Sequence, residues 1–228
     1  MIVTICSLFR DSSRYLHRYF TQLCSQLPIT QLRFVFLEGD SRDDTLTKLR
    51  EWASGPYAAN VQVLKHDLGV PRFGPVAPPV PGGRERFIAL AEIGNIVLDA
   101  VPANSDYTCW LESDLIIPPG LLPALLQVAK GEHVAAPYVY HARSKVFYDT
   151  WAFRDKGCVF THLAPYARKK HTTPFELSSA GSVLLIPHKY IAAGARFTEE
   201  EVIVGLCKNI RKEGGKIMAV PNIQVYHP

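Results

Sequence analysis

The stretch YTCWLESDLIIPPG, Tyr107 to Gly120, carries an apolar run into two acidic residues and then into a Pro-Pro-Gly turn. The run predicts a strand that delivers Glu112 and Asp114 at its end. Side chains two positions apart on a strand lie on one face, roughly 7 Å apart. Two carboxylates so placed can bind one hard divalent cation that also accepts phosphate oxygens. Acidic residues also follow strands in ordinary surface loops, so this stretch alone leaves both interpretations open.

The composition indicates one soluble globular domain. The chain has 228 residues, of which 47% are hydrophobic and 20% charged, and its net charge is +4. The basic residues are dispersed and form no stripe of the kind that binds nucleic acid. The sequence opens on a strand-like run without a signal sequence, and no apolar run is long enough to cross a bilayer, so we expect a cytoplasmic protein. The odd number of cysteines, without a CxxC pair, predicts reduced thiols at Cys6, Cys24, Cys109, Cys158 and Cys207.

The residues before this stretch predict alternating strands and helices. Apolar, β-rich runs at 2–8, 32–37 and 61–64 predict strands, with helices between them. This order is typical of an open α/β sheet, which binds its ligand beyond the carboxyl ends of the strands. The first polar or aromatic residues after each strand are therefore candidate ligand contacts: Phe9, Arg10, Glu38, Asp40, His66 and Asp67. Asp40 equally suits a local turn.

Two further segments each admit two interpretations. Arg84 and Arg86 begin a predicted helix, where they would meet a diphosphate or remain exposed. The segment KVFYDTWAFRDKG, residues 145–157, contains Asp149 and Trp151. Its mix of aromatic and charged side chains suits a sugar pocket, and it equally suits an aromatic sheet edge.

The remaining polar segments have simple structural explanations. A helix is predicted over 199–213, and its dipole accounts for the three glutamates at its start, Glu199 to Glu201. The Pro- and Gly-rich residues 71–83 form a spacer or a lid, and the basic residues 168–171 are solvated or close over phosphates. His227 follows the last predicted strand and, from its position alone, is a frayed end.

Four segments together resemble one family, in the same order and across nearly the whole chain. They are residues 4–46, residues 84–126 with the Arg-containing helix and the LESD strand, FYDTWAFRDKG at 147–157, and the Gly-to-Gly-to-His segment 205–228. The chain resembles GT-A-fold glycosyltransferases, and within them the fungal mannan-polymerase-type and capsule-synthesis mannosyltransferases. No single segment carries this resemblance by itself.

The resemblance implies an α/β fold: a single GT-A, Rossmann-like domain with a mostly parallel central sheet flanked by helices. Residues 1–115 would form the donor-binding half, and residues 116–228 the acceptor-binding half with a C-terminal metal ligand. The implied activity is metal-dependent transfer of a sugar from a GDP- or UDP-sugar, with GDP-mannose suggested, to a hydroxyl of a glycan or glycolipid. A nucleic acid acceptor is not excluded. The implied cofactor is Mn²⁺ or Mg²⁺.

The resemblance also assigns roles to residues. Asp114 becomes a metal ligand and His227 its partner, while Glu112 stands where the family has Asp and contacts the metal, directly or through water, or the donor ribose. The nucleotide site would comprise Leu8, Phe9, Arg10, Glu38 and Asp40, with Arg86 on the donor phosphates or sugar and with Asp149 and Trp151 at the sugar or acceptor. The position that usually holds an acidic catalytic residue falls at Val204, so Glu200 or Glu201, about one turn earlier, would serve instead, alongside Asp149.

Two other functional classes remain open at this point. A nucleotidyltransferase would carry a Gly-rich basic loop after the first strand, and SLFRDSSRY at residues 7–15 has no glycine. A non-catalytic module that binds nucleotide sugars or carbohydrates is favoured by the altered acidic triplet. Metal-dependent turnover of a nucleotide sugar separates an enzyme from such a module.

Overall fold

The computed structural model describes residues 1–70, 79–155 and 172–228. Cys158, the basic residues 168–171 and most of the Pro-rich stretch lie outside these ranges. The described strands are β1 (Val3–Phe9), β2 (Leu32–Glu38), β3 (Val61–Lys65), β4 (Tyr107–Leu111), β5 (Val134–His141), β6 (Phe175–Leu177), β7 (Val183–Pro187) and β8 (Ile217–His227). The described helices are α1 (Ser13–Cys24), α2 (Thr45–Ser54), α3 (Gly83–Asp99), α4 (Leu121–Ala129), α6 (His188–Ala192) and α7 (Ile203–Lys212), with short 3₁₀ turns at Ile29–Gln31 and Ala58–Asn60.

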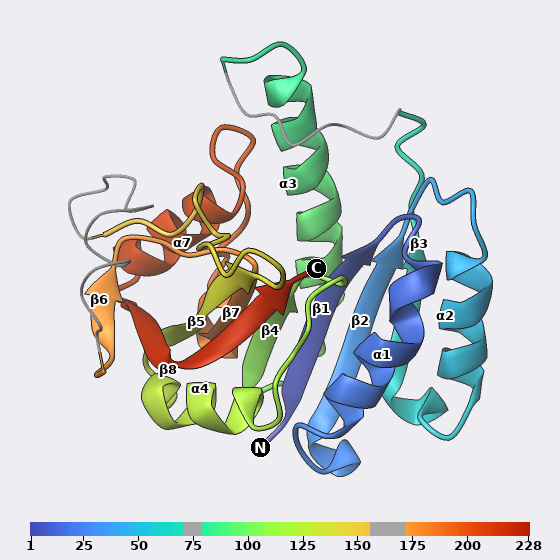
Figure 1. The fold of residues 1–228 in the computed structure, drawn as a ribbon, viewed down its shortest axis with the longest axis horizontal. Helices are drawn as coiled ribbons and strands as arrows, with labels where there is room; N and C mark the ends of the chain where they lie inside the picture. Colours follow the sequence, from blue (N-terminus) through green and yellow to red (C-terminus); the bar gives the residue numbers. More distant parts are fainter. Residues whose placement is uncertain (71–78, 156–171) are drawn as a thin grey trace.

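The described strands form one mixed sheet in the order β3-β2-β1-β4-β7-β5-β8-β6. The first four neighbours run parallel, as the alternating sequence pattern predicts. β7 is antiparallel to both β4 and β5, and β6 is antiparallel to β8, while β5 and β8 are parallel. The α/β fold with a central sheet flanked by helices is thereby confirmed (Figure 1).

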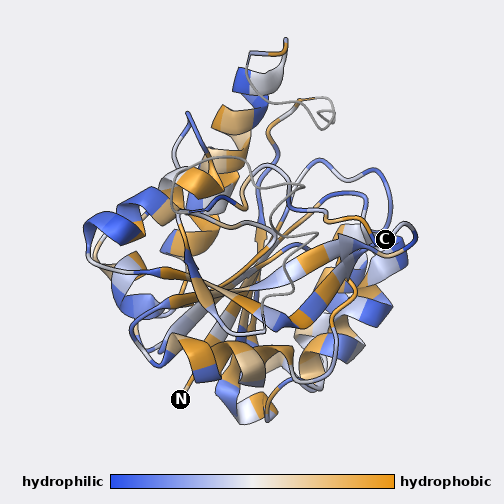
Figure 2. Cartoon of the chain, turned by 60° about the vertical axis from the view of Figure 1, so that its left-hand side comes forward, coloured by the Kyte–Doolittle hydropathy of each residue, from blue (hydrophilic) through white to orange (hydrophobic). Residues whose placement is uncertain are grey.

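Helices cover both faces of the sheet and enclose two apolar cores. One core joins α1 and α4 to one face, through residues such as Tyr19 and Leu125. The other joins α3 and α7 to the opposite face, through Val97 and Leu206. Figure 2 shows apolar residues gathered where the helices meet the strands. In the part of the chain that the structure describes, no helix is both long and apolar enough to span a membrane.

The predicted start of the last helix is wrong. Helix α7 begins at Ile203, not near Glu199. Residues 198–202 instead form a tight loop, in which Val202 donates a 2.7 Å backbone hydrogen bond to Thr198. The three glutamates therefore lie before the helix, and the helix dipole does not explain them.

The carboxyl ends of several strands lie at one edge of the sheet. The carboxyl ends of β1, β2 and β3 lie in register at Phe9, Glu38 and Lys65. The end of β8 reaches the same region, because Ile116 and Tyr226 form an antiparallel bridge with backbone hydrogen bonds of 2.7 and 3.1 Å. This bridge brings the last residues of the chain beside the acidic residues that follow β4.

Candidate active site

Two adjoining cavities lie beyond these strand ends, with volumes of about 700 Å³ and about 300 Å³. The larger is lined by the end of β4, by residues 148–152 and by the loop before α7. The smaller lies over the ends of β1, β2 and β3. Five residues line both cavities: Leu8, Arg86, Leu90, Ser113 and Asp114. The junction of the two cavities therefore lies between α3 and the acidic residues after β4.

Asp114 and His227 form a pair at this junction. The Nε2 atom of His227 lies 3.1 Å from Oδ2 of Asp114. The His227 ring stacks on Tyr148 with centroids 4.0 Å apart, and Arg18 donates a 2.6 Å hydrogen bond to the Asp114 carbonyl oxygen. Burial lowers the pKa of His227, but the hydrogen bond and charge of Asp114 outweigh burial, so the pKa lies above its usual value. The frayed-end interpretation of His227 is therefore wrong.

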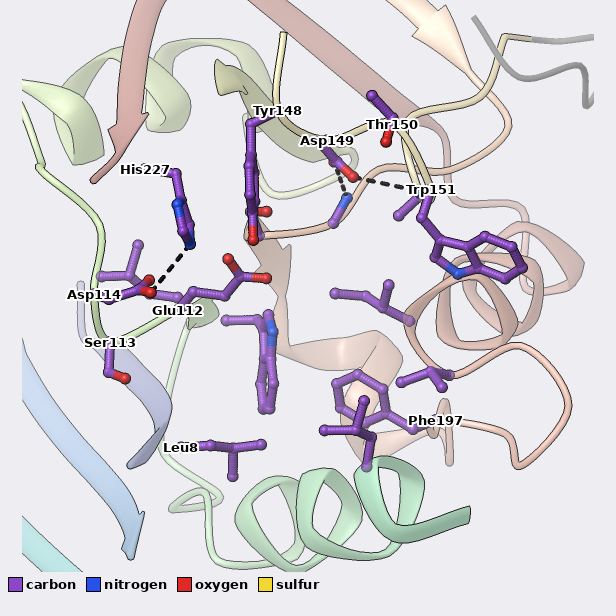
Figure 3. A pocket seen from close by; sticks show the side chains of 18 of the residues that line it. Leu8, Glu112, Ser113, Asp114, Tyr148, Asp149, Thr150, Trp151, Phe197 and His227 are labelled. Carbon is purple, nitrogen blue, oxygen red and sulfur yellow. Dashed lines mark hydrogen bonds and ion pairs between the residues drawn. The ribbon is translucent and has the colours of Figure 1, made fainter. Parts of the chain in front are cut away.

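Glu112 lies just beyond the end of β4, since that strand stops at Leu111. The expectation that Glu112 and Asp114 share one face of a strand is thus wrong, although both line the larger cavity. The Glu112 amide donates a 3.0 Å hydrogen bond to the Ser182 carbonyl, which fixes its backbone. Burial, with the charges of Asp114 and Asp149, raises the pKa of Glu112 to about 7. Figure 3 shows its side chain directed into the cavity below Tyr148.

The donor atoms at this junction suit a divalent cation. A carboxylate oxygen and an imidazole nitrogen are ligands that Mn²⁺ accepts. Among the described residues no group of three or more His, Cys, Asp or Glu side chains is arranged to hold a metal, so Glu112 does not complete such a group with Asp114 and His227. Two protein ligands would leave the remaining positions to phosphate oxygens and water, which fits a metal that binds together with a diphosphate.

Asp149 is buried and links residues 149–152 to Gly181 through hydrogen bonds. Its carboxylate accepts backbone hydrogen bonds of 2.7 Å from Gly181 and 3.2 Å from Ala152. Burial nevertheless raises its pKa to about 6, against the effect of these amides. Gly181 is required here, because a β-carbon would lie 2.8 Å from the β-carbon of Ala152. Its small size serves this internal contact.

Trp151 and Arg86 line the larger cavity from two sides. The Trp151 ring packs edge-on against Phe87, with centroids 5.3 Å apart, and the Arg154 guanidinium lies 5.0 Å from the Trp151 ring. Arg86 also lines the smaller cavity, so it reaches the junction that Asp114 occupies. Burial lowers the pKa of Arg86, while the neighbouring Tyr148 and Glu112 oppose this.

The smaller cavity contains most of the predicted nucleotide contacts. Leu8, Phe9, Arg10 and Asp40 all line it. The Asp40 carboxylate accepts 3.1 Å hydrogen bonds from the amides of Leu68 and Gly69, and thus also anchors the chain after β3. Asp40 therefore both holds a local turn and lines the cavity.

Of the residues to which the resemblance assigns a role, three line neither cavity. Glu38 is buried and bonds to Lys65 at 3.0 Å and to the Ser41 amide at 3.0 Å. Glu200 is exposed, and Glu201 pairs with Arg154 at 3.8 Å and with Lys208. None of these glutamates is among the lining residues.

Val202 and Ile203 line the larger cavity near the start of α7, and Phe197 lies on the wall across from Asp114 and His227 (Figure 3). The sequence placed Val202 and Ile203 on the inward face of the predicted helix and did not predict that any of these three residues lines a cavity. Val202 has φ 50° and ψ −117°, a backbone conformation that β-branched residues rarely adopt. A valine at this point gives no sequence signal for such a turn.

Comparisons with known proteins find similarity at the level of structure. No protein-family model matches the chain, and no curated protein matches it either. The structure of S. aureus TarS 1-349 in complex with UDP-GlcNAc has a TM-score of 0.62 and 12% identity, with 99% of this chain and 58% of that chain covered. GalNAc-T7 with UDP, GalNAc and Mn²⁺ has a TM-score of 0.67 and 16% identity, with coverage of 99% and 43%.

A mannosyltransferase supplies a third match. PcManGT from Pyrobaculum calidifontis, in complex with GDP-Man and Mn²⁺, has a TM-score of 0.62 and 13% identity, with 98% of this chain and 56% of that chain covered. The chain spans about half the length of these structures. The narrower resemblance to fungal mannan polymerases is not confirmed by any of them. At these identities the matches establish architecture, and the chain has the GT-A fold of the glycosyltransferase structures it matches.

Proposed function

We propose that this protein is a glycosyltransferase that moves a sugar from a nucleotide-sugar donor to a hydroxyl acceptor. The observation that carries the proposal is the Asp114–His227 pair, 3.1 Å apart, at the junction of two cavities. A nucleotide sugar has three parts of different chemistry: a nucleoside, a diphosphate and a sugar. Two cavities with the Asp114–His227 pair and Arg86 between them match this division.

Different residues would contact the three parts of the donor. The smaller cavity, with Arg10 and Asp40, would hold the nucleoside. Arg86 would pair with the diphosphate, because a guanidinium binds phosphate oxygens through parallel hydrogen bonds. Asp114 and His227 would hold Mn²⁺ or Mg²⁺, which when bound neutralises charge on the departing diphosphate. The larger cavity, with Asp149 and Trp151, would hold the sugar and the attacking acceptor.

The carboxylates at the larger cavity support transfer with retention of configuration. In the described residues they are Glu112, Asp114 and Asp149. The undescribed segments 71–78 and 156–171 contain no Asp or Glu. Among the described residues, the wall across from Asp114 presents Phe197, whereas an inverting transfer would need a base on the side that faces away from the diphosphate. In front-face transfer the acceptor oxygen bonds to the anomeric carbon, the bond to the diphosphate breaks, and the diphosphate oxygen takes the acceptor proton.

The donor that we propose is GDP-mannose, on the resemblance of residues 147–157 to capsule-synthesis mannosyltransferases. The mannosyltransferase of similar fold was solved with GDP-Man and Mn²⁺, which agrees with this choice. We expect the protein to turn over GDP-mannose faster than UDP-GlcNAc.

The test measures melting temperature and donor turnover across a panel of nucleotide sugars, with and without Mn²⁺. A ligand that binds the native state raises the melting temperature by mass action. We expect one donor to give a metal-dependent rise, and we expect Asp114→Ala to abolish that rise and the turnover without unfolding the chain. Glu51→Ala, which removes an exposed carboxylate on α2, is the matched control. Equal turnover by wild type and Asp114→Ala would contradict the proposal.

A further inference from the structure

Residues 201–204 form a tight turn whose sequence conflicts with its conformation. The Val204 amide donates a 3.0 Å hydrogen bond to the Glu201 carbonyl, which closes a four-residue turn. Val202, its first central residue, has φ 50° and ψ −117°. These angles are the mirror image of a type II turn, the type II′ conformation, whose first central position glycine dominates. A β-branched side chain at this position is strained.

The turn is fixed by its surroundings rather than by its own sequence. Thr198 and Val202 form a backbone bridge, and Gly205 lets α7 pack against the Thr198 side chain, since a β-carbon there would lie 2.6 Å from Thr198 Cγ2. Arg154 and Lys208 pair with Glu201 beside it. Backbone strain that the surrounding structure maintains is found at functional sites. The side chain held by this strained backbone lines the larger cavity.

The cavity around Val202 has two chemically different walls. Asp114, His227 and Glu112 form the polar wall, while Asp149 lies beside Trp151 (Figure 3). The apolar wall is formed by Phe87, Leu90, Trp151, Phe197, Val202 and Ile203. The hydroxyls of a transferred sugar need hydrogen-bond partners, and the polar wall supplies them. A hydroxyl against the apolar wall would lose water without gaining a partner, which is unfavourable.

We propose that the apolar wall binds a hydrocarbon group of the acceptor, next to the hydroxyl that attacks the sugar, and that Val202 is a specificity-determining residue of this subsite. The inference rests on the proposed function, because it concerns the acceptor side of the same cavity. The acceptor class is then a hydroxyl compound that carries an alkyl chain, as a glycolipid does. Burial of each methylene against such a wall favours binding.

The test compares two probes that differ only in their alkyl group: n-octyl α-D-mannopyranoside, below its micellar concentration, and methyl α-D-mannopyranoside. Calorimetry measures their Kd with the protein alone and with GDP and Mn²⁺ added. We expect the octyl compound to bind at least about tenfold more tightly than the methyl compound. Equal affinities would overturn the proposal, and they would show that the wall serves the protein's own packing or the carbon face of a sugar.

Variants locate the subsite. Val202→Gly folds, because glycine adopts the turn without strain, and it removes the wall's isopropyl group. We expect it to reduce the octyl-to-methyl affinity ratio about fivefold while the melting-temperature rise with GDP and Mn²⁺ is unchanged. Val146→Gly, which removes an exposed valine elsewhere, leaves the ratio unchanged. An octyl affinity that Val202→Gly does not alter would place the binding on another surface and overturn the proposal. If GDP and Mn²⁺ do not raise the melting temperature of the wild-type protein, this result would instead contradict the proposed function.

Discussion

Replacement of Gly181 by alanine should disturb the candidate active site in a measurable way. The new β-carbon would lie 2.8 Å from the β-carbon of Ala152 and 3.3 Å from Oδ1 of Asp149. Carbon atoms pack at about 3.5–4.0 Å, so one of the two segments must move by about 1 Å. Both are backbone-anchored, because Gly181 donates a 2.7 Å hydrogen bond to the Asp149 carboxylate. The substitution therefore pushes apart two segments that line the larger cavity.

The cost has two parts. Overpacking a tight contact costs about 1–3 kcal/mol. Weakening a hydrogen bond to a charged group costs up to about 1.5–3 kcal/mol more. The free energy of unfolding should thus fall by about 1–6 kcal/mol. A displacement of about 1 Å near reacting groups can cost about 100-fold in rate, so donor turnover should fall by a similar factor.

Urea denaturation and donor turnover measure the two effects. Gly55→Ala is the matched control, because its nearest atoms would lie at ordinary distances of 3.4 and 3.6 Å and its φ is −83°. Ala152→Gly should restore stability in the Gly181→Ala background, since it removes the clashing atom and keeps the amide that bonds Asp149. A Gly181→Ala protein as stable and active as Gly55→Ala, or a double variant no better than the single one, would refute the reasoning.

Two other predictions concern the same region. Burial raises the pKa of Asp149 to about 6, so between about pH 4 and pH 6 the folded protein binds a proton that the unfolded chain does not. The wild-type free energy of unfolding should therefore fall by up to about 3 kcal/mol relative to Asp149→Asn as pH rises through this window, and parallel urea titrations of the two proteins would contradict this. Gly205→Ala should destabilise by at least about 1–3 kcal/mol, because its β-carbon overlaps Thr198, whereas Gly55→Ala should not. Thr198→Ala should recover part of that loss in a double-mutant cycle, and strict additivity would rule out the clash.

Sequence patterns predicted the parallel half of the sheet well, for a physical reason. Strands buried on both faces must be apolar throughout, so β1 and β2 stand out, and their polar ends mark the ligand edge. Asp114 was found in this way. His227 gave no such signal, since its position beside Asp114 depends on the Ile116–Tyr226 bridge, which joins residues far apart in the chain.

The cavity walls depend on tertiary packing and were harder to predict. The three glutamates at 199–201 looked like the start of a helix, because acidic residues favour that position. The backbone instead forms another turn before α7 begins. Val202 and Ile203 line the cavity, and the glutamates do not. Local propensity was overridden here by the bridge between Thr198 and Val202.

The strained turn at Val202, which the sequence did not predict, bears on the proposed alkyl subsite. A glycine at 202 would make the turn without strain, and it would leave the cavity without an isopropyl group. Strain of this kind costs about 1–3 kcal/mol, a large share of a stability of about 5–15 kcal/mol. A residue chosen only for folding would relieve that cost, whereas a residue chosen for its contact with a ligand would retain it. If Val202→Gly raises the melting temperature while weakening alkyl binding, the strain at this turn is the energetic cost of the apolar subsite.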